Sequence, residues 1–447
     1  MSATADNPPR VAVVAEFYPS ERDPVLGVWA HRQALASRDA GADIHVLVLY
    51  RPIAPHAALE RSVEAFARET LGLARQPRRE VRDGLPVTYV PFLSPPRPRT
   101  YATWGAWAGP SLALGLRRLR RRFAFELVHA HNAVPSGDAV RRARLPVPLV
   151  VSVHGGDVLY TAPRMRGGDR AVRGTLGAAR LVLANSRGIE ALAREYGARE
   201  TRVVHLGADL PGRSSEAGAN RARAARSHAP RRLITVGHLV GRKRHADVIR
   251  ALALLADGHP DLSDAVAGDG PERANLEALA VRLRVADRVR FLGALEPSRV
   301  GDELARADLF VMPSVDEAFG VAYIEAMGIA VPAIGCRGEP GPEEIAHAGQ
   351  GMVLVAPRDP KALAGTISSL LENREELGRL GEQARDTVER AFTWTACGSA
   401  TAVEDAGPVL PVLVADDCDQ AVPESPDWAT GDSVRLALPP SPPLKLP

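Results

Sequence analysis

Short runs of consecutive apolar residues alternate along this chain with longer segments of amphipathic pattern. Strands that are buried on both faces of a parallel sheet have such near-continuous apolar runs. The amphipathic segments between them, such as 29–42 and 187–198, have the apolar spacing of helices. The strands are predicted at 10–17, 44–50, 85–92, 127–131, 148–154 and 180–185, and again at 232–238, 264–270, 289–295, 308–314, 330–336 and 351–357.

The same pattern occurs on both sides of a polar segment of small residues at 211–231. Alternating strands and helices are typical of α/β proteins with a doubly wound parallel sheet. We therefore expect two Rossmann-like domains, at 1–210 and 232–395, that face each other across a cleft, with 211–231 as the linker. In such sheets the ligand site lies at the carboxyl ends of the strands.

The end of the chain has no sustained periodicity. Residues 406–447 contain nine of the 37 prolines. A segment of this composition buries too little apolar surface to fold by itself. We expect 396–447 to be a Pro-rich, disordered tail, and the part beyond Gly407 to be dispensable for the fold.

Composition excludes several classes of protein. With 447 residues, 45% hydrophobic and 24% charged, the chain fits a globular protein of two cores. Its three cysteines form no Cys-x-x-Cys pair, which argues against a disulfide scaffold or a cysteine zinc module. No apolar run is long enough for a membrane span, and the polar start is unlike a signal peptide, so a cytoplasmic location is expected. The net charge of +3 gives no support for a nucleic-acid partner.

The segment 313–335 carries the strongest chemical signal, two glutamates eight residues apart. Gly320 would let Glu317 lie in a loop before a helix that begins near Val321, with Glu325 on its second turn. Free amides of Phe319, Gly320 and Val321 at that helix start would favour a phosphate group. The two carboxylates could then bind hydroxyls on either side of a diphosphate. The alternative is two surface glutamates near a helix start.

A lysine and two glycine turns suggest further phosphate contacts. Lys243 is one of three lysines among 56 basic residues, and it follows Gly237 by six positions. A compact ammonium suits a diphosphate, although a solvated lysine in a basic run is the alternative. Gly268 and Gly270 form a turn at a strand end, where glycine permits close approach of a ligand, but a plain tight turn is equally consistent.

Histidines occur at predicted strand ends and at a helix entry in the first half. His129 and His131 lie on the same side of a strand, but no third ligand follows at helical spacing, so we favour an acceptor-side position for His131 over a metal site. His154 and Asp157 flank two glycines directly after a buried run, which places them at the cleft. The alternative for His154 is a structural histidine.

Taken together, these motifs resemble the Glu-x7-Glu signature of retaining nucleotide-sugar glycosyltransferases of family 4, which have the GT-B fold. The likeness extends over most of residues 10–395. The segments that carry it are 236–252, 267–280, 289–295, 307–314 and Phe392-Thr-Trp394. In this family the chain continues after Phe-x-Trp as a helix that returns to the first domain. Because the helical pattern fades after Ala406, we expect that crossing to be short or absent here.

The resemblance implies roles for residues of the second half. Glu317 would contact the hydroxyls of the donor sugar, and Glu325 would hold the nucleotide ribose. Lys243 would bind the diphosphate together with the amides of the helix start. The residues expected on the donor side are Gly27, Gly237, Arg242, Arg244, Gly268, Gly270, Phe319, Gly320, Val321 and Glu325. The family usually has an arginine where this chain has His238, and Arg242 and Arg244 are alternatives for the missing charge.

The resemblance also implies roles in the first half. The loop at 24–33, with Gly27 and His31, would close over the sugar and the acceptor. His154 would position the donor sugar and, with Glu317 and Lys243, belong to the catalytic group. His31, His131 and Asp157 would lie on the acceptor side.

The resemblance implies a retaining, metal-independent transferase that needs no cofactor besides its nucleotide-sugar donor. The acceptor would be a glycan or a lipid-linked glycan in polysaccharide or glycolipid biosynthesis. A nucleotide-sugar 2-epimerase of the same fold and a non-catalytic nucleotide-sugar-binding protein are the alternatives. A dehydrogenase is disfavoured because the first strand–helix junction lacks Gly-x-Gly-x-x-Gly. The basic segment 111–125 is either a solvated helix face or a peripheral contact with an anionic membrane.

Overall fold

The computed structural model describes residues 8–54, 56–97, 99–210 and 231–405. These residues belong to one compact unit, Met1–Gly407. The predicted linker, apart from its last residue, and the chain from 406 onward lie outside the described residues. Within the described part of the chain, no helix combines the length and apolar character needed to cross a bilayer.

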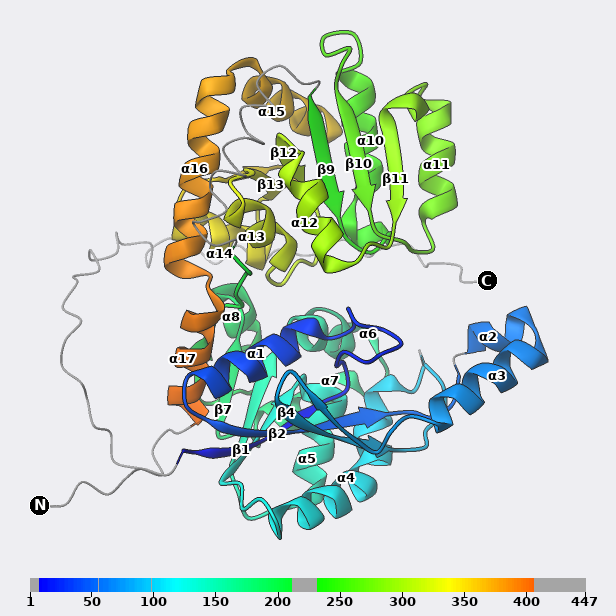
Figure 1. Ribbon diagram of the computed structural model, residues 1–447, viewed down its shortest axis with the longest axis vertical. Coiled ribbons are helices and arrows are strands. Elements are labelled where there is room, and N and C mark those ends of the chain that lie inside the picture. The colour runs from blue at the N-terminus through cyan, green and yellow to red at the C-terminus, as the bar shows by residue number, and fades with distance from the viewer. Residues whose placement is uncertain (1–7, 55, 98, 211–230, 406–447) are drawn as a thin grey trace, which may run out of the picture. The chain divides into compact units, whose positions relative to one another are not determined.

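The first half forms an eight-stranded sheet in the order β3-β4-β2-β1-β5-β6-β7-β8 (Figure 1). Neighbouring strands are parallel except β3, which pairs antiparallel with β4. The strands are β1 Arg10–Ala15, β2 Asp43–Tyr50, β3 Arg79–Arg82, β4 Leu85–Pro91, β5 Leu127–His131, β6 Leu149–Val153, β7 Leu181–Ala184 and β8 Thr201–Val203. All six predicted strands are confirmed. The short edge strands β3 and β8 were not predicted, because they are polar and only partly buried.

Helices cover both faces of this sheet. Along β1, Val11 and Val13 face one apolar core and Ala12 and Val14 face the other, as the two-residue period of a strand requires. The helices are α1 Val28–Asp39, α2 His56–Arg61, α3 Val63–Ala74, α4 Trp104–Arg120, α5 Asp138–Ala143, α6 Ala162–Arg164, α7 Gly168–Leu176 and α8 Arg187–Glu195, with short helical turns at Tyr101–Thr103, Ala133–Gly137 and Gly156–Thr161. The two helices predicted by pattern correspond to α1 and α8.

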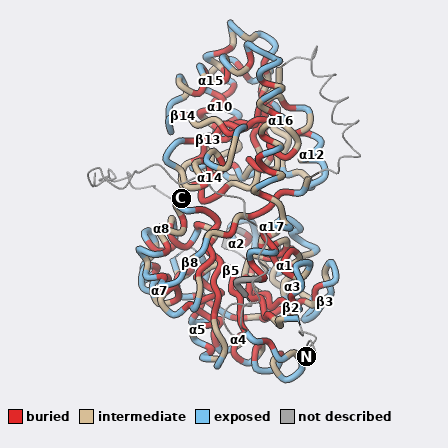
Figure 2. The backbone as a smooth tube through the Cα atoms, turned by 90° about the vertical axis from the view of Figure 1, so that its left-hand side faces the viewer, coloured by how far each residue is buried: buried red, intermediate tan, exposed pale blue. Residues whose placement is uncertain are grey.

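The second half forms a six-stranded parallel sheet in the order β11-β10-β9-β12-β13-β14. All six predicted strands are confirmed, and Figure 2 shows β13 among the buried backbone of this half. The strands are β9 Arg232–Val236, β10 Ser263–Ala267, β11 Val289–Gly293, β12 Leu309–Val311, β13 Ala333–Cys336 and β14 Met352–Val355. The helices are α10 His245–Leu254, α11 Arg273–Arg282, α12 Pro297–Ala305, α13 Val321–Gly328, α14 Pro340–Ala348, α15 Pro360–Glu372, α16 Arg374–Ala391 and α17 Trp394–Asp405, with turns at Gly241–Lys243 and Ala286–Arg288.

Helix α17 corrects two predictions: that residues 396–405 belong to a disordered tail, and that the helix returning to the first domain is short or absent. Residues 396–405 are helical, and α17 packs against α1 of the first half (Figure 1). A Cβ atom on Gly398 would lie 2.1 Å from the carbonyl oxygen of Ala36, and Gln33 donates a hydrogen bond of 2.9 Å to Thr401. The expectation of a short or absent crossing was wrong, because small residues that permit close helix packing give little amphipathic signal.

The two segments that connect the halves run side by side. Ala208 pairs with Thr393 in an isolated parallel bridge, and its amide donates a hydrogen bond of 2.9 Å to the Phe392 carbonyl. A Cβ atom on Gly207 would lie 2.3 Å from the amide nitrogen of Trp394. The chain therefore passes between the two halves along two adjacent paths.

Candidate functional site

The loop after β12 and the start of α13 have the predicted geometry. Helix α13 begins at Val321, and Gly320 precedes it with φ 87°. A Cβ atom on Gly320 would lie 2.4 Å from a ring carbon of Tyr323, so glycine is required there. Among the described residues, the amides of Phe319, Gly320 and Val321 have no protein acceptor. The helix start can therefore accept an anion from solvent.

Lys243 and Glu317 form a buried ion pair at this loop. The Lys243 ammonium lies 2.5 Å from a carboxylate oxygen of Glu317, and the side chains are 12% and 9% exposed. Burial alone would raise the pKa of Glu317, but Lys243 and then Arg242 outweigh it, so the pKa of this carboxyl is lowered. The structure thus joins two residues that the sequence placed in one site.

Arg242 and Arg244 point to different partners. A guanidinium nitrogen of Arg242 lies 3.7 Å from the Glu317 carboxylate, and the Arg242 carbonyl accepts a hydrogen bond of 2.8 Å from the amide of Val315. Arg244 instead donates a bond of 2.7 Å to Asp247 of α10. Of the two predicted alternatives, Arg242 lies nearer to the buried pair.

Three other predicted glycines of this half lie close together, and two of them approach neighbouring backbone. Gly237 follows β9, and a Cβ atom there would lie 3.7 Å from the Lys243 side chain. On Gly268, which has φ 142°, a Cβ atom would lie 2.0 Å from the Gly237 carbonyl oxygen. On Gly270 it would lie 2.6 Å from the carbonyl oxygen of Leu239. The contacts of Gly268 and Gly270 explain why the turn needs glycine at these two positions, whatever it binds.

Glu325 lies on the second turn of α13 and is half-buried. Burial raises the pKa of its carboxyl, and the nearby charge of Arg32 on α1 acts in the opposite direction. No described residue forms a hydrogen bond with the Glu325 carboxylate, so its oxygens are available to hydroxyl groups of a ligand.

Glu339 supports the loop and was not predicted. Its carboxylate accepts a hydrogen bond of 2.9 Å from the amide of Glu317, and the Glu317 carbonyl accepts one of 3.0 Å from Gly341. Burial is the main cause of the raised pKa of Glu339. No spacing rule links Glu339 to the site, because it comes from the loop after the next strand.

Three histidines stack at the carboxyl ends of β5 and β6. The rings of His131 and His154 are parallel within 4°, and His131 Nδ1 lies 3.0 Å from His154 Nε2. His129 stacks on His131 and bonds to Ser152 at 2.8 Å. Burial lowers the pKa of His154 to about 3, and it also lowers that of His131. Both rings are therefore neutral near pH 7 and serve as hydrogen-bonding groups.

Asp157 lies in the same region and fixes a turn of backbone. Its two carboxylate oxygens accept hydrogen bonds of 3.0 and 3.1 Å from the amides of Ala133 and Val134. Burial raises the pKa of this carboxyl to about 6, although these amides act to lower it. Asp157 therefore supports the end of β5, and its acceptor-side role stays a prediction.

His31 lies on α1, away from the histidine stack, and hydrogen bonds fix its ring. Its ring nitrogens lie 2.7 Å from the Tyr18 hydroxyl and 2.7 Å from the Asp83 carboxylate, so both are occupied. With Arg32 it lines a cavity of about 710 Å³. Gly27 precedes α1 with φ 70°. A Cβ atom at this position would lie 2.1–2.2 Å from the carbonyl group of Phe17, so glycine leaves room for that carbonyl. The structure does not bring His31 into the histidine stack.

Glu16, at the end of β1, anchors a cluster that the sequence did not reveal. It accepts a hydrogen bond of 2.8 Å from Tyr101 and forms an ion pair with Arg97. The guanidinium of Arg97 lies 4.0 Å from the ring centre of Tyr101 and 4.9 Å from that of Trp104. The signal that could have found Glu16 is its place directly after a buried strand, at the ligand edge of the sheet.

Residues of the first half contact the loop before α13 directly. Ser186 donates a hydrogen bond of 2.9 Å to the Ala318 carbonyl, and Arg164 forms an ion pair of 2.8 Å with Asp316. Gly155, next to His154, has φ 96° and packs against Ala318. The histidine stack and the Lys243 loop are therefore parts of one site.

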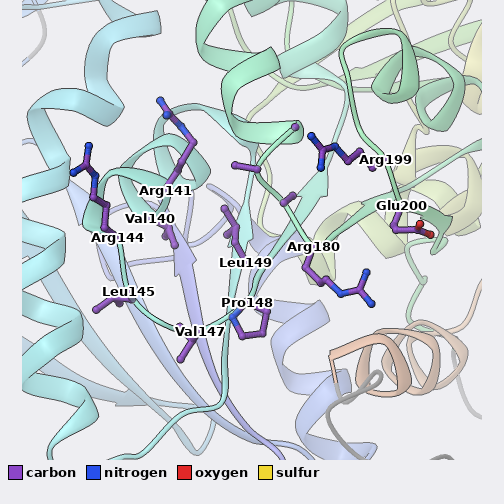
Figure 3. Close-up of a pocket in the computed structure, with 13 residues that line it drawn as sticks. Val140, Arg141, Arg144, Leu145, Val147, Pro148, Leu149, Arg180, Arg199 and Glu200 are labelled. Carbon is purple, nitrogen blue, oxygen red and sulfur yellow. The ribbon is translucent and has the colours of Figure 1, made fainter.

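A further pocket lies away from these residues. Figure 3 shows Arg141, Arg144, Arg180 and Arg199 around a cavity of about 540 Å³, and their side chains point in different directions. The pocket borders the amino ends of β6, β7 and β8, the edge of the sheet opposite to the histidine stack. It is therefore not part of the candidate site.

Among the described residues, no group of three His, Cys, Asp or Glu side chains is arranged to hold a metal ion.

Two protein families match the chain. Glycosyltransferase Family 4 matches residues 25–211, and Glycosyl transferases group 1 matches residues 218–387. The chain is 30% identical over 404 residues to a D-inositol 3-phosphate glycosyltransferase of Streptomyces bingchenggensis, covering 81% of this chain and 83% of that protein. It is 27% identical over 392 residues to a Bacillus subtilis glycosyltransferase named for teichuronic acid biosynthesis, covering 86% and 94%.

A solved structure is similar in fold. HepE of Anabaena, solved in complex with UDP and glucose, superposes with a TM-score of 0.65 at 19% identity. The match covers 89% of this chain and 99% of that one.

Proposed function

The chain belongs to the group 1, family 4 glycosyltransferases, and we propose that it uses a nucleotide-diphosphate sugar and retains the anomeric configuration. Its two parallel-sheet domains have the GT-B architecture. The acceptor in this proposal is a glycan or a lipid-linked glycan, and the reaction takes place in the cytoplasm. The relatives' names, which refer to teichuronic acid and to inositol phosphate, support a role in polysaccharide or glycoconjugate biosynthesis.

The observation that carries the proposal is the buried pair of Lys243 and Glu317 at the start of α13. Breaking the donor's glycosidic bond leaves a growing negative charge on the diphosphate. Lys243, Arg242 and the free amides of the helix start are positioned to stabilise that charge. Glu317, released from Lys243 when the diphosphate takes its place, can then accept hydrogen bonds from the sugar hydroxyls.

Retention is proposed to proceed by attack on the face of the leaving group. A covalent intermediate needs a carboxylate free to act as nucleophile, as in retaining glycosidases. In this proposal the Glu317 carboxylate is instead engaged by the sugar hydroxyls once the donor is bound, and Asp157 is held by two backbone amides. A donor phosphate oxygen can take the acceptor's proton, so the proposal needs no metal ion and no further cofactor.

The test begins with a binding panel of UDP-, GDP- and ADP-sugars, followed by proton NMR of the product formed from the best donor. An α-linked product from an α-linked donor is expected, and a β linkage would refute retention. Lys243→Ala should lower the rate of sugar transfer at least about a hundredfold. Removal of one hydrogen-bond donor that stabilises transition-state charge has an effect of this size. Lys361→Ala, which removes an exposed lysine of the same domain, is the control. Inversion at C2 of the donor sugar would instead support an epimerase.

A further inference from the structure

The outward face of α4 changes character along its length. Trp107, Pro110, Leu114 and Arg118 are exposed, as is Arg121, the residue directly after the helix, and at about 100° per residue they fall within an arc of about 80°. The exposed fractions of Trp107 and Leu114 are 51% and 48%. The face therefore begins with large apolar side chains and ends with arginines, while the opposite face is buried in the core.

Among the described residues, no salt bridge neutralises the basic part of this face. Residues 104–122 include no aspartate or glutamate. Within the part of the chain that the structure describes, none of the arginines at 117, 118 and 120–122 forms a salt bridge. Arginines in a helix face usually gain from acidic neighbours one turn away, as Arg141 and Arg142 of α5 do with Asp138.

The amino end of α4 lies at the acceptor side of the candidate site. Trp104, the first residue of α4, packs against Tyr101, which binds Glu16 at the end of β1. A helix of 17 residues is about 25 Å long, so α4 spans from the ligand edge of the sheet to its opposite edge. A flat surface that lies along α4 would therefore also reach the acceptor side.

The arginine-lined pocket lies at the same edge as the basic end of α4. Arg144, Arg180 and Arg199 bring positive charge to it, whereas Arg141 is paired with Asp138 and Glu200 also lines the pocket. Helix α5, which carries Arg141 and ends next to Arg144, packs along α4 (Figure 1). Arg180 and Arg199 border the pocket beside the amino ends of β7 and β8. This edge of the first domain thus carries several cations in addition to those of α4.

We propose that the face formed by Trp107, Leu114, Arg118 and Arg121 docks on a membrane surface that contains anionic lipids. The apolar part would enter the headgroup region, and the arginines would contact lipid phosphates. Double-stranded nucleic acid is disfavoured as the partner, because large exposed apolar side chains share the stripe with the cations. Docking itself does not depend on the proposed function. Its consequence does, because docking would bring the acceptor side of a glycosyltransferase to lipid-linked glycans.

The test is sedimentation of the full-length protein with vesicles of phosphatidylcholine alone and with phosphatidylglycerol added. Binding is expected only with the anionic lipid, and high salt should weaken it. Because each surface cation contributes to attraction by anionic lipid, Arg118→Glu/Arg121→Glu should weaken partitioning at least about tenfold. Trp107→Ser should weaken it several-fold. Arg282→Glu/Arg299→Glu, which changes the same charge at exposed arginines of the second domain, is the matched control.

Folding and donor binding are checked separately, by thermal unfolding and by calorimetry with the preferred nucleotide. Both should be unchanged in all three variants, so loss of vesicle binding would be independent of the proposed activity. Equal binding to both kinds of vesicle, or equal effects of the test and control pairs, would refute the docking face. Tighter binding to double-stranded DNA than to anionic vesicles, unaffected by Trp107→Ser, would refute the membrane as partner.

Discussion

Gly155 of the first domain and Ala318 of the second approach so closely that a Cβ atom on Gly155 would lie 2.2 Å from the Cβ of Ala318. Gly155 follows His154, and Ala318 follows Glu317. The backbone conformation at Gly155, with φ 96°, also disfavours any other residue. The contact therefore couples the histidine stack to the loop that carries the buried ion pair.

Gly155→Ala should lower the transfer rate at least about tenfold, because a displacement of about 1 Å at reacting groups has effects of this size or larger. Steady-state kinetics with the best donor would measure it. Gly156→Ala is the matched control, since a Cβ atom there has no neighbour within 4 Å. Equal activity of the two variants would show that the contact does not matter for catalysis.

Glu325→Ala should weaken nucleotide binding by roughly 1.5–3 kcal/mol, the value of a hydrogen bond to a charged group. The reason is the loss of a half-buried carboxylate that has no protein partner among the described residues and would accept bonds from ribose hydroxyls. Isothermal calorimetry with the free nucleoside diphosphate measures this directly. Glu375→Ala, at an exposed position of α16, should leave affinity unchanged. If Glu325→Ala binds the nucleoside diphosphate with unchanged affinity, Glu325 does not contact the ribose.

Asp264 should make the protein less stable as pH rises. Its side chain is buried, neither oxygen has a hydrogen-bond partner among the described residues, and burial raises its pKa to about 7. The folded state therefore keeps a proton that the unfolded state loses near pH 4, so the free energy of unfolding falls between about pH 4 and pH 7.

Asp264→Asn should remove this fall, which is of the order of 1–3 kcal/mol. Urea unfolding at pH 5 and pH 8 would measure the difference for the wild type, for this variant and for Asp261→Asn, an exposed control. The same pH dependence in all three proteins would contradict the assignment to Asp264.

Gly398→Ala should destabilise the protein by roughly 1–3 kcal/mol, because its Cβ atom would meet the Ala36 carbonyl between α17 and α1. Thermal unfolding gives the change. Gly378→Ala in α16, where a Cβ atom has no neighbour within 4 Å, should be neutral or stabilising.

A protein that ends at Gly407 should keep its thermal transition. Loss of that transition would show that the tail contributes to the fold.

The fold and the clustering of Lys243, Glu317 and the start of α13 were predictable from sequence because their signals are local. Buried parallel strands give apolar runs, and Lys243, Gly320 and Glu325 stand at fixed spacings from strand and helix ends. The cluster around Glu16 was less predictable. Glu16 and Arg97 are 81 residues apart, and their meeting depends on how the loop after β4 folds back over β1.

The paired segments at Ala208 and Thr393 lie where a hinge between the two domains would have to lie. Because both connections between the domains pass through this strip, rotation about it is the one large relative motion that keeps both paths intact, whereas sliding would break the bridge between them. Opening by such a rotation would separate Ala318 from Gly155 and Ser186. Substrates would then enter and leave in the open state, and the site would be assembled in the closed state of the same rotation.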